Sequence, residues 1–346
     1  MTFPLLRLPG LAREHTVEQM EVREQFRFAT LSKKTKRFAR NAIRQVSYTI
    51  DWSLEVGKND VSIAKTGSYS SLDMNIMPIE KKGAYPETDG KFYLYVNDID
   101  ECSIYLLRIL DGLNFFQNSK FQLTFTHLPS DFIKEFLTTS QDLSINIHQL
   151  EVVGGNPDDE FYTWLMENCC NVKRLLNFCS TTPEFQFDSQ VPFPGEWCYL
   201  DDPSWLKLSH VANLFMNCRY LSVPRRNHQL TEKDLNQIVK LWMEDSKLEF
   251  FSVDLKESIN FDIIMKDIEK EPIERAYVGK SDKVFQPGMA FKIRQKSGQE
   301  AVVSLSDVYG KSFVINTHFD GLDCDLWKEE SPYSSDMEDE EEDDEE

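Results

Sequence analysis

Very few side chains in this sequence have the types and spacing that concerted chemistry requires. The sequence lacks a P-loop, a G-x-G-x-x-G turn, a G-x-S-x-G nucleophile elbow and an H-E-x-x-H zinc motif. The six histidines are scattered without the spacing of metal ligands: His15, His127, His148, His210, His228 and His318. The sequence therefore predicts no catalytic, metal-binding or cofactor-binding residues, and we expect a protein that is not an enzyme.

Seven cysteines are the other candidates for reactivity. Only Cys169, Cys170 and Cys179 cluster, and spacing gives no support for a thiol–imidazole pair between one of the first two and His148. Buried, inert thiols are the favoured interpretation. The odd number and the absence of C-x-x-C argue against a disulfide framework or a zinc ribbon. We therefore expect reduced thiols and a cytoplasmic and/or nuclear location.

Charge is distributed unevenly along the chain. The net charge is −20, yet residues 3–44 hold ten Lys/Arg against four Asp/Glu, whereas residues 336–346 hold ten acidic residues in eleven. An acidic body argues against general nucleic-acid binding, because phosphate contacts need basic clusters. The basic stretch Lys33–Arg44 is interpreted as a solvated helix face. No signal peptide is recognisable and no run reaches the roughly 20 apolar residues of a membrane helix, so we expect no membrane association.

The basic residues 3–44 have the pattern of three short helices. An apolar lead-in ends at Pro9, and Ser32 is a plausible N-cap for the third helix. The apolar positions are Leu11, Val17 and Met20 for the first helix, Phe26, Phe28 and Leu31 for the second, and Phe38, Ala39 and Ala42 for the third. About forty residues bury too little surface to be robust alone, so an uncovered apolar surface suggests a partner.

Three motifs in this stretch resemble an F-box of the family that also carries a type-2 F-box-associated domain. They are F-P-L-L-R-L-P at Phe3–Pro9, Met20 before Glu21, and L-S-K-K-T-K-R at Leu31–Arg37. The resemblance implies a three-helix unit that docks on the Skp adaptor and, through it, on a cullin ubiquitin ligase. Its implied adaptor-binding residues are Phe3, Leu5, Leu8, Pro9, Leu11, Val17, Met20, Phe26 and Leu31. Arg13 and Thr16 stand where that family has aliphatic residues.

After residue 44 the pattern changes to strands. Short alternating runs from 45 to 76, separated by Gly57–Asp60 and Gly67–Ser68, predict an antiparallel meander, followed by a loop at 78–90. From 91 to 287, strands and helices alternate in units of about 25 to 30 residues, which is typical of a solenoid. Residues 180–204 interrupt this alternation with four prolines and several aromatic residues. They are either a loop packed on the body, which we favour, or an exposed recognition loop.

The resemblance extends to residues 205–255. The motifs are W-L-K-L at Trp205–Leu208, N-C-R-Y-L at Asn217–Leu221 and L-T-E-K-D-L-N at Leu230–Asn236, followed by Trp242 and Leu248-Glu249. They are similar to the type-2 F-box-associated domain, which implies a leucine-rich-repeat-like, substrate-binding fold. For Leu235, Ile238 and Trp242, the periodicity alone predicts buried core positions that touch no substrate.

Together these patterns predict an α/β (α+β overall) protein. The predicted regions are an F-box at 3–44, antiparallel strands and a loop at 45–90, a leucine-rich-repeat-like strand–helix body at 91–287, hairpins at 288–320 and a disordered acidic tail at 321–346. The resemblance implies a non-catalytic substrate adaptor of a Skp–cullin–F-box ubiquitin ligase, which binds an unidentified protein substrate. Two alternatives stay open: a repeat scaffold without ligase coupling, and an enzyme of unknown type.

Overall fold

The computed structural model describes residues 9–82, 91–225, 227–255, 260–273, 275–278, 281–284, 289–306 and 312–318. The helices in this part are α1 (Gly10–Gln19), α2 (Val22–Thr30), α3 (Lys33–Ile43), η2 (Ile79–Lys81), α4 (Ile99–Gly112), α5 (Ser130–Asp142), α6 (Asp159–Asn168), α7 (Leu208–His210), η3 (Val211–Phe215), α8 (Glu232–Glu244) and α9 (Phe261–Ile264).

The strands of the described part begin after α3. They are β1 (Tyr48–Glu55), β2 (Lys58–Lys65), β3 (Ser71–Pro78), β4 (Phe92–Val96), β5 (Lys120–Thr126), β6 (Ile147–Val153), β7 (Val172–Asn177), β8 (Trp197–Leu200), β9 (Tyr220–Val223), β10 (Phe250–Asp254), β11 (Glu271–Pro272), β12 (Arg275–Val278), β13 (Ser281–Val284), β14 (Ala290–Arg294), β15 (Glu300–Ser306) and β16 (Ser312–Asn316). The predicted mixed α/β class is thereby confirmed.

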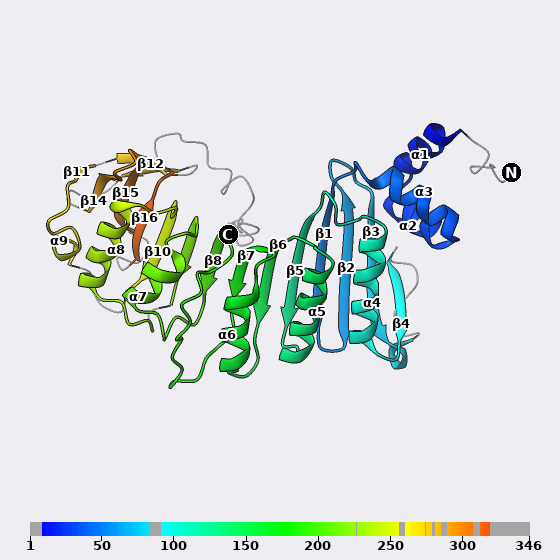
Figure 1. Ribbon diagram of the computed structural model, residues 1–346, viewed down its shortest axis with the longest axis horizontal. Helices are drawn as coiled ribbons and strands as arrows, with labels where there is room; N and C mark the ends of the chain where they lie inside the picture. Colours follow the sequence, from blue (N-terminus) through cyan, green and yellow to red (C-terminus); the bar gives the residue numbers. More distant parts are fainter. Residues whose placement is uncertain are drawn as a thin grey trace, which may run out of the picture.

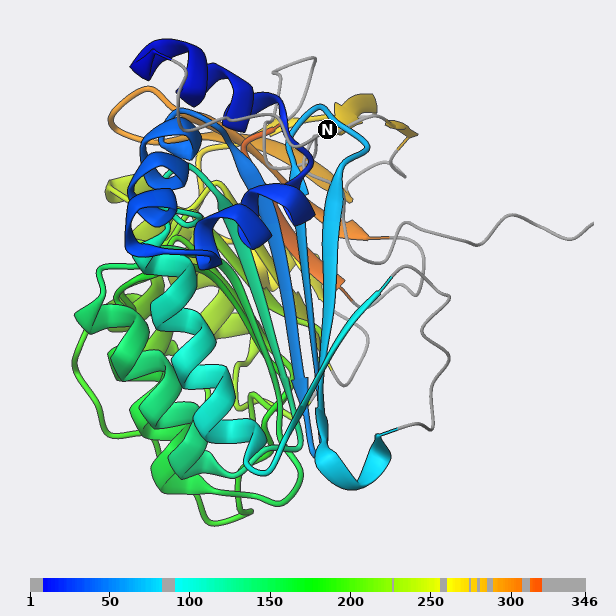
Figure 2. The same ribbon diagram turned by 90° about the vertical axis from the view of Figure 1, so that its right-hand side faces the viewer.

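One long sheet organises the described chain, in the order β11-β14-β15-β16-β10-β9-β8-β7-β6-β5-β1-β2-β3-β4. From β5 to β10 every strand is parallel to its neighbour and the strands follow chain order. Helices α4, α5 and α6 lie side by side along one face of this sheet (Figures 1 and 2). The parallel arrangement follows from the strand–helix alternation, because a parallel neighbour needs a crossover connection.

β1, β2 and β3 form the antiparallel meander that the sequence predicted, whereas β4, which the sequence places in the strand–helix array, pairs in parallel with β3 at the edge of the sheet. β1 and β2 pair in antiparallel fashion, as do β2 and β3. In β1 the buried Tyr48, Ile50, Trp52 and Leu54 alternate with more exposed residues, which places one row of side chains against the helices. β1 also pairs with β5 in parallel, so the meander continues directly into the strand–helix array.

Local sequence signals set several helix starts. Asp98 caps α4 and Asp158 caps α6 through their side chains. The sequence Thr231-Glu232-Lys233-Asp234 predicts a capping box, and Thr231 and Asp234 form one at α8. Pro129 also predicts a helix start, and α5 begins directly after it, with the apolar stripe that the spacing predicts, Phe132, Ile133, Phe136 and Leu137, buried. Leu235, Ile238 and Trp242 are fully buried in α8, which confirms them as core residues.

Other expectations need correction. Residues 180–204 are not all loop, because β8 lies within them, and the buried Phe187 and Phe193 support packing on the body. The sequence favours Ser209 as a helix N-cap, but it lies inside α7, whose N-cap is Lys207. The apolar spacing of Phe261, Ile264, Met265 and Ile268 predicts a helix over 261–268, but the structure has only α9 (Phe261–Ile264) there.

The carboxyl-terminal part is antiparallel. β14, β15 and β16 pair in sequence, and β16 joins the main sheet beside β10. Gly298 adopts a positive φ of 95° in the tight connection between β14 and β15, the turn that Ser297-Gly298 predicted. The predicted turn at Tyr309-Gly310 and the predicted disordered tail lie outside the described residues. Among the described helices, none is long and apolar enough to cross a membrane.

Candidate protein-interaction surfaces

Helices α1, α2 and α3 form a small unit at the β1–β3 end of the sheet (Figure 1). The predicted adaptor-binding residues fall into four groups, of which the fourth is Val17. Leu11 and Leu31 leave 83% and 74% of their surface in solvent, and Pro9 is also exposed. Met20 and Phe26 are half-buried. Phe3, Leu5 and Leu8 lie outside the described residues. The unit therefore leaves two large leucines uncovered.

Val17 differs from the other predicted contact residues because it is completely buried. It belongs to a shared core with Val22, Ala29 and Ile43. A side chain in this position contacts its own helices rather than a partner. Val17 therefore holds the three helices together and leaves contact to exposed residues such as Leu11.

Arg13 and Thr16, which depart from the F-box pattern, are accommodated locally. The Arg13 guanidinium lies 4.1 Å from the centroid of the Phe38 ring, which links α1 to α3 through a cation–π contact. The Thr16 hydroxyl donates a hydrogen bond to the Ala12 carbonyl at 2.6 Å. Both departures therefore serve packing and hydrogen bonding inside the unit.

Residues of the β2–β3 hairpin form hydrogen bonds with backbone groups at the ends of α1 and α2. Lys65 Nζ donates to the Glu18 carbonyl in the last turn of α1 at 2.9 Å. The first amide of α2, at Val22, donates to Ser70 Oγ from the β2–β3 connection at 2.9 Å, and α2 has no side-chain cap of its own. The backbone groups at a helix end have no partner within the helix. These two contacts from the β2–β3 hairpin therefore stabilise the end of α1 and the start of α2.

A buried polar bridge joins the same two parts. Gln25 is fully buried and donates through Nε2 to the Val17 carbonyl at 3.0 Å, while the Tyr48 hydroxyl donates to Gln25 Oε1 at 2.9 Å. Burial raises the pKa of Tyr48 well above its ordinary value. A satisfied buried network tolerates little displacement, so the helical unit is held in one orientation relative to the sheet.

The second surface is the face of the sheet that α4, α5 and α6 do not cover. On this face an aromatic row crosses β8, β9 and β10, formed by Trp197, Tyr220 and Phe250 at consecutive register positions. The ring centroids of Trp197 and Tyr220 are 4.6 Å apart, and those of Tyr220 and Phe250 are 4.4 Å apart, with nearly parallel planes. All three side chains are half-buried. The row is a rigid aromatic strip along the strand starts.

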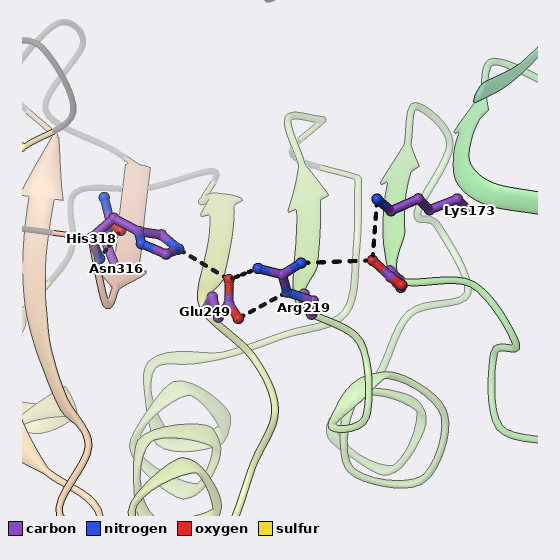
Figure 3. Close-up of polar contacts among 6 residues, drawn as sticks. Lys173, Arg219, Glu249, Asn316 and His318 are labelled. Carbon is purple, nitrogen blue, oxygen red and sulfur yellow. Dashed lines mark hydrogen bonds and ion pairs between the residues drawn. The ribbon is translucent and has the colours of Figure 1, made fainter. Parts of the chain in front are cut away.

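A charged row flanks the aromatic row: Glu196, Arg219 and Glu249 directly precede its three aromatic residues. Figure 3 shows Arg219 and Glu249 with Lys173 and His318, which extend the charged row at its two ends. The Arg219 guanidinium donates two hydrogen bonds of 2.8 Å to the Glu249 carboxylate. Glu196 lies 3.9 Å from Lys173 Nζ and 3.7 Å from Arg219, and His318 Nε2 is 3.1 Å from Glu249 Oε2. Signs alternate along the row, so its charges compensate one another.

Sequence reasoning did not single out these two rows as a surface. The prolines around Trp197 predict a loop, and the patterns around Tyr220 and Phe250 predict strands without a shared surface. A recurring signal was nonetheless present, because a charged residue precedes an aromatic one at the start of three strands, in Glu196-Trp197, Arg219-Tyr220 and Glu249-Phe250. Repetition of such a pair in successive repeats indicates one continuous row.

Two hollows lie among the described residues. One of about 320 Å³ on the uncovered sheet face contains Asp51, Asp60 and Asp73, and burial raises the pKa of Asp51. The other, of about 610 Å³, includes His127 and Cys179, and burial raises the pKa of Cys179 to about 12. That thiol stays protonated at neutral pH and is a poor nucleophile. No group of three potential metal ligands occurs in the described part of the chain.

Comparison with known proteins identifies the region that carries the aromatic row and the Glu196, Arg219 and Glu249 part of the charged row. The family described as F-box associated (FBA_2) matches residues 192–253, which include β8, β9, α8 and β10. The chain is also similar to the Skn-1 dependent zygotic transcript 15 protein of Caenorhabditis elegans, with 23% identity over 338 residues, covering 87% of this chain and 94% of that protein. No solved structure matches. The chain therefore carries an F-box-associated domain of the FBA_2 type at residues 192–253, in agreement with the resemblance drawn from its sequence.

Proposed function

We propose that this protein is a non-catalytic substrate-recognition adaptor of a Skp–cullin–F-box ubiquitin ligase. Helices α1 to α3 dock on the Skp adaptor as an F-box, and the body, a leucine-rich-repeat-like array, holds a protein substrate. The observation that carries the proposal is the F-box-associated domain in a chain whose N-terminal helices leave Leu11 and Leu31 uncovered. Uncovered large leucines on a small basic unit favour a protein partner.

The attachment of the helical unit supports this proposal. An adaptor accelerates ubiquitin transfer by holding the substrate near the charged conjugating enzyme, so its own residues supply proximity rather than bond chemistry. A fixed orientation of the helical unit relative to the body positions the substrate better than a flexible connection would. The Gln25–Tyr48 bridge and the Ser70 contact to Val22 provide that fixed geometry.

The strand–helix order supports the repeat-like description of the body. Strands β5 to β10 lie side by side in chain order, with helices on one face, as in solenoids that expose their strands for binding. A cytoplasmic and/or nuclear location accords with buried free thiols such as Cys169 and Cys198.

A pulldown with purified Skp adaptor tests the docking. Replacing Leu11 and Leu31 by Ser should weaken binding roughly tenfold for each leucine, because truncated interface anchors cost about 1–2 kcal/mol. Both side chains are exposed, so the fold should be unaffected. Val56→Ser is the matched control, since Val56 is 72% exposed and follows the far end of β1. Undiminished binding by the double variant would refute docking through these helices.

The alternative is a repeat scaffold without ligase coupling. It is favoured by Arg13, whose guanidinium packs on Phe38 where the F-box pattern has an aliphatic residue. Failure of the intact, folded protein to bind the adaptor at micromolar concentration would support this alternative.

A further inference from the structure

Helix α3 presents a cationic surface, which we call the basic face. It consists of Lys33, Lys34, Lys36, Arg37, Arg40 and Arg44, all exposed, and the stretch contains no acidic residue. Arg40 Nε donates to Asn114 Oδ1 at 3.1 Å. Arg40 also attracts the Asp111 carboxylate, but within the described residues no carboxylate lies at ion-pair distance from any of the six. Six like charges within about 18 Å of helix repel one another, which favours an anionic partner.

The basic face differs from the charged row on the sheet. There, Lys173 and Arg219 are matched by Glu196 and Glu249 at 2.8–3.9 Å. An anionic segment would gain little by displacing those carboxylates. An anionic segment should therefore bind the basic face of α3 in preference to the charged row on the sheet.

The chain itself contains a segment of matching chemistry. Residues 336–346 hold ten carboxylates in eleven positions, more than enough to neutralise the six cations of α3. We infer that the basic face of α3 is a docking surface for the acidic segment Asp336–Glu346 of the same chain. The contact is electrostatic and multivalent, so it should be strong at low salt and weaken steeply as salt is added.

The length of the chain permits this contact. β16 runs antiparallel to β10 and ends opposite the start of β10, with Asn316 beside Phe250. α3 leads directly into the start of β1, which is parallel to the strands from β5 to β10. His318 and Arg44 therefore lie at the same edge of the sheet, about 34 Å apart at seven strand spacings. The seventeen residues 319–335 can span about 55 Å when extended.

Lysine acetylation in the full-length protein tests the inference. With a limiting amine-reactive ester, mass spectrometry gives the acetylation rates of Lys33, Lys34 and Lys36. A variant with all ten carboxylates of residues 336–346 changed to their amides should be acetylated about fivefold faster at these lysines. Lys233, exposed at the start of α8, is the internal control. At about 0.5 M NaCl, where the Debye length is about 4 Å, parent and variant should become equal.

Carbodiimide cross-linking identifies the partner of the basic face. Equal amounts of ¹⁴N- and ¹⁵N-labelled protein are mixed, so links within one chain and between chains have different masses. Links from residues 336–346 to Lys33, Lys34 or Lys36 within one chain support the inference. Equal acetylation rates in parent and variant, the same change at Lys233, or links exclusively between chains would overturn it. Neither measurement involves an adaptor, so this inference can fail while the proposed function stands.

Discussion

Single side chains decide how firmly the helical unit is held, and Tyr48 is the clearest case. Tyr48 is 1% exposed, and its hydroxyl donates to Gln25 Oε1 at 2.9 Å. Tyr48→Phe keeps the ring but leaves a buried acceptor without its donor, so we expect a loss of about 1–2 kcal/mol in the free energy of unfolding. Urea unfolding measures it, with Tyr69→Phe as the control because Tyr69 is fully exposed. Equal midpoints for the two variants would contradict the bridge.

Asp202 should make the protein sensitive to acid. Burial disfavours its charged form, but hydrogen bonds from the Thr181 amide at 2.8 Å and from Asn227 at 2.8 Å outweigh this, so its pKa lies below the ordinary value of 3.8. A carboxyl with a lowered pKa in the folded state stabilises the protein above the unfolded-state pKa, and this stabilisation is lost as pH falls through the lower folded-state pKa.

The corresponding test compares unfolding in urea between about pH 5 and about pH 3. The parent should lose more free energy of unfolding over this range than Asp202→Asn, which has no proton to take up at that position. Glu80→Gln, at an exposed carboxylate, controls for general charge effects. If the parent and Asp202→Asn lose the same amount, Asp202 is not the acid-sensitive group.

At the scale of elements, the capping box at α3 is a separate source of stability. Ser32 Oγ accepts a hydrogen bond from the Thr35 amide at 3.2 Å, and Thr35 Oγ1 accepts one from the Ser32 amide at 2.9 Å. Ser32→Ala removes the first of these, so α3 should lose about 1 kcal/mol. Hydrogen exchange of α3 amides should be about fivefold faster, with α8 unchanged as an internal control. Unchanged protection of α3 would show that tertiary packing alone fixes this helix.

Features of the fold that depend on neighbouring residues could be predicted from the sequence, whereas features that depend on distant segments could not. The Ser32 cap, the Thr231–Asp234 box and the start of α5 after Pro129 were predicted correctly, because neighbouring residues determine them. Strand β8 was missed because its four residues lie among prolines, and its pairing with β7 and β9 comes from distant segments. The contact of Arg13 with Phe38 also escaped prediction, because it depends on how two helices cross.

At the scale of the whole molecule, the sheet joins the candidate docking helices to the F-box-associated domain without a break. β1 follows α3 and pairs with β5, and the parallel strands then run through β6 and β7 to β8. The sequence predicted the strands on both sides of this junction but not that they form one sheet, since the β1–β5 pairing joins residues about seventy positions apart. Such a continuous sheet can hold the two surfaces at a fixed separation.

Local stability should also differ along the continuous sheet. β4 forms one edge of the main sheet and pairs there with β3, whereas β6 lies in the interior with a partner on each side. In β4 every side chain is half-buried, while Ile147, Leu150 and Val152 of β6 are fully buried. Backbone amides exchange through local opening, and an edge strand opens by breaking contacts on one side.

Hydrogen exchange measured by mass spectrometry should therefore find the amides of β4 at least about tenfold less protected than those of β6. The Leu11 and Leu31 double Ser variant should show the same difference, because both leucines are solvent-exposed and contribute little to the core. Equal protection of β4 and β6 would mean that the sheet opens as one cooperative unit. In that case the two candidate interaction surfaces would be lost together rather than one end at a time.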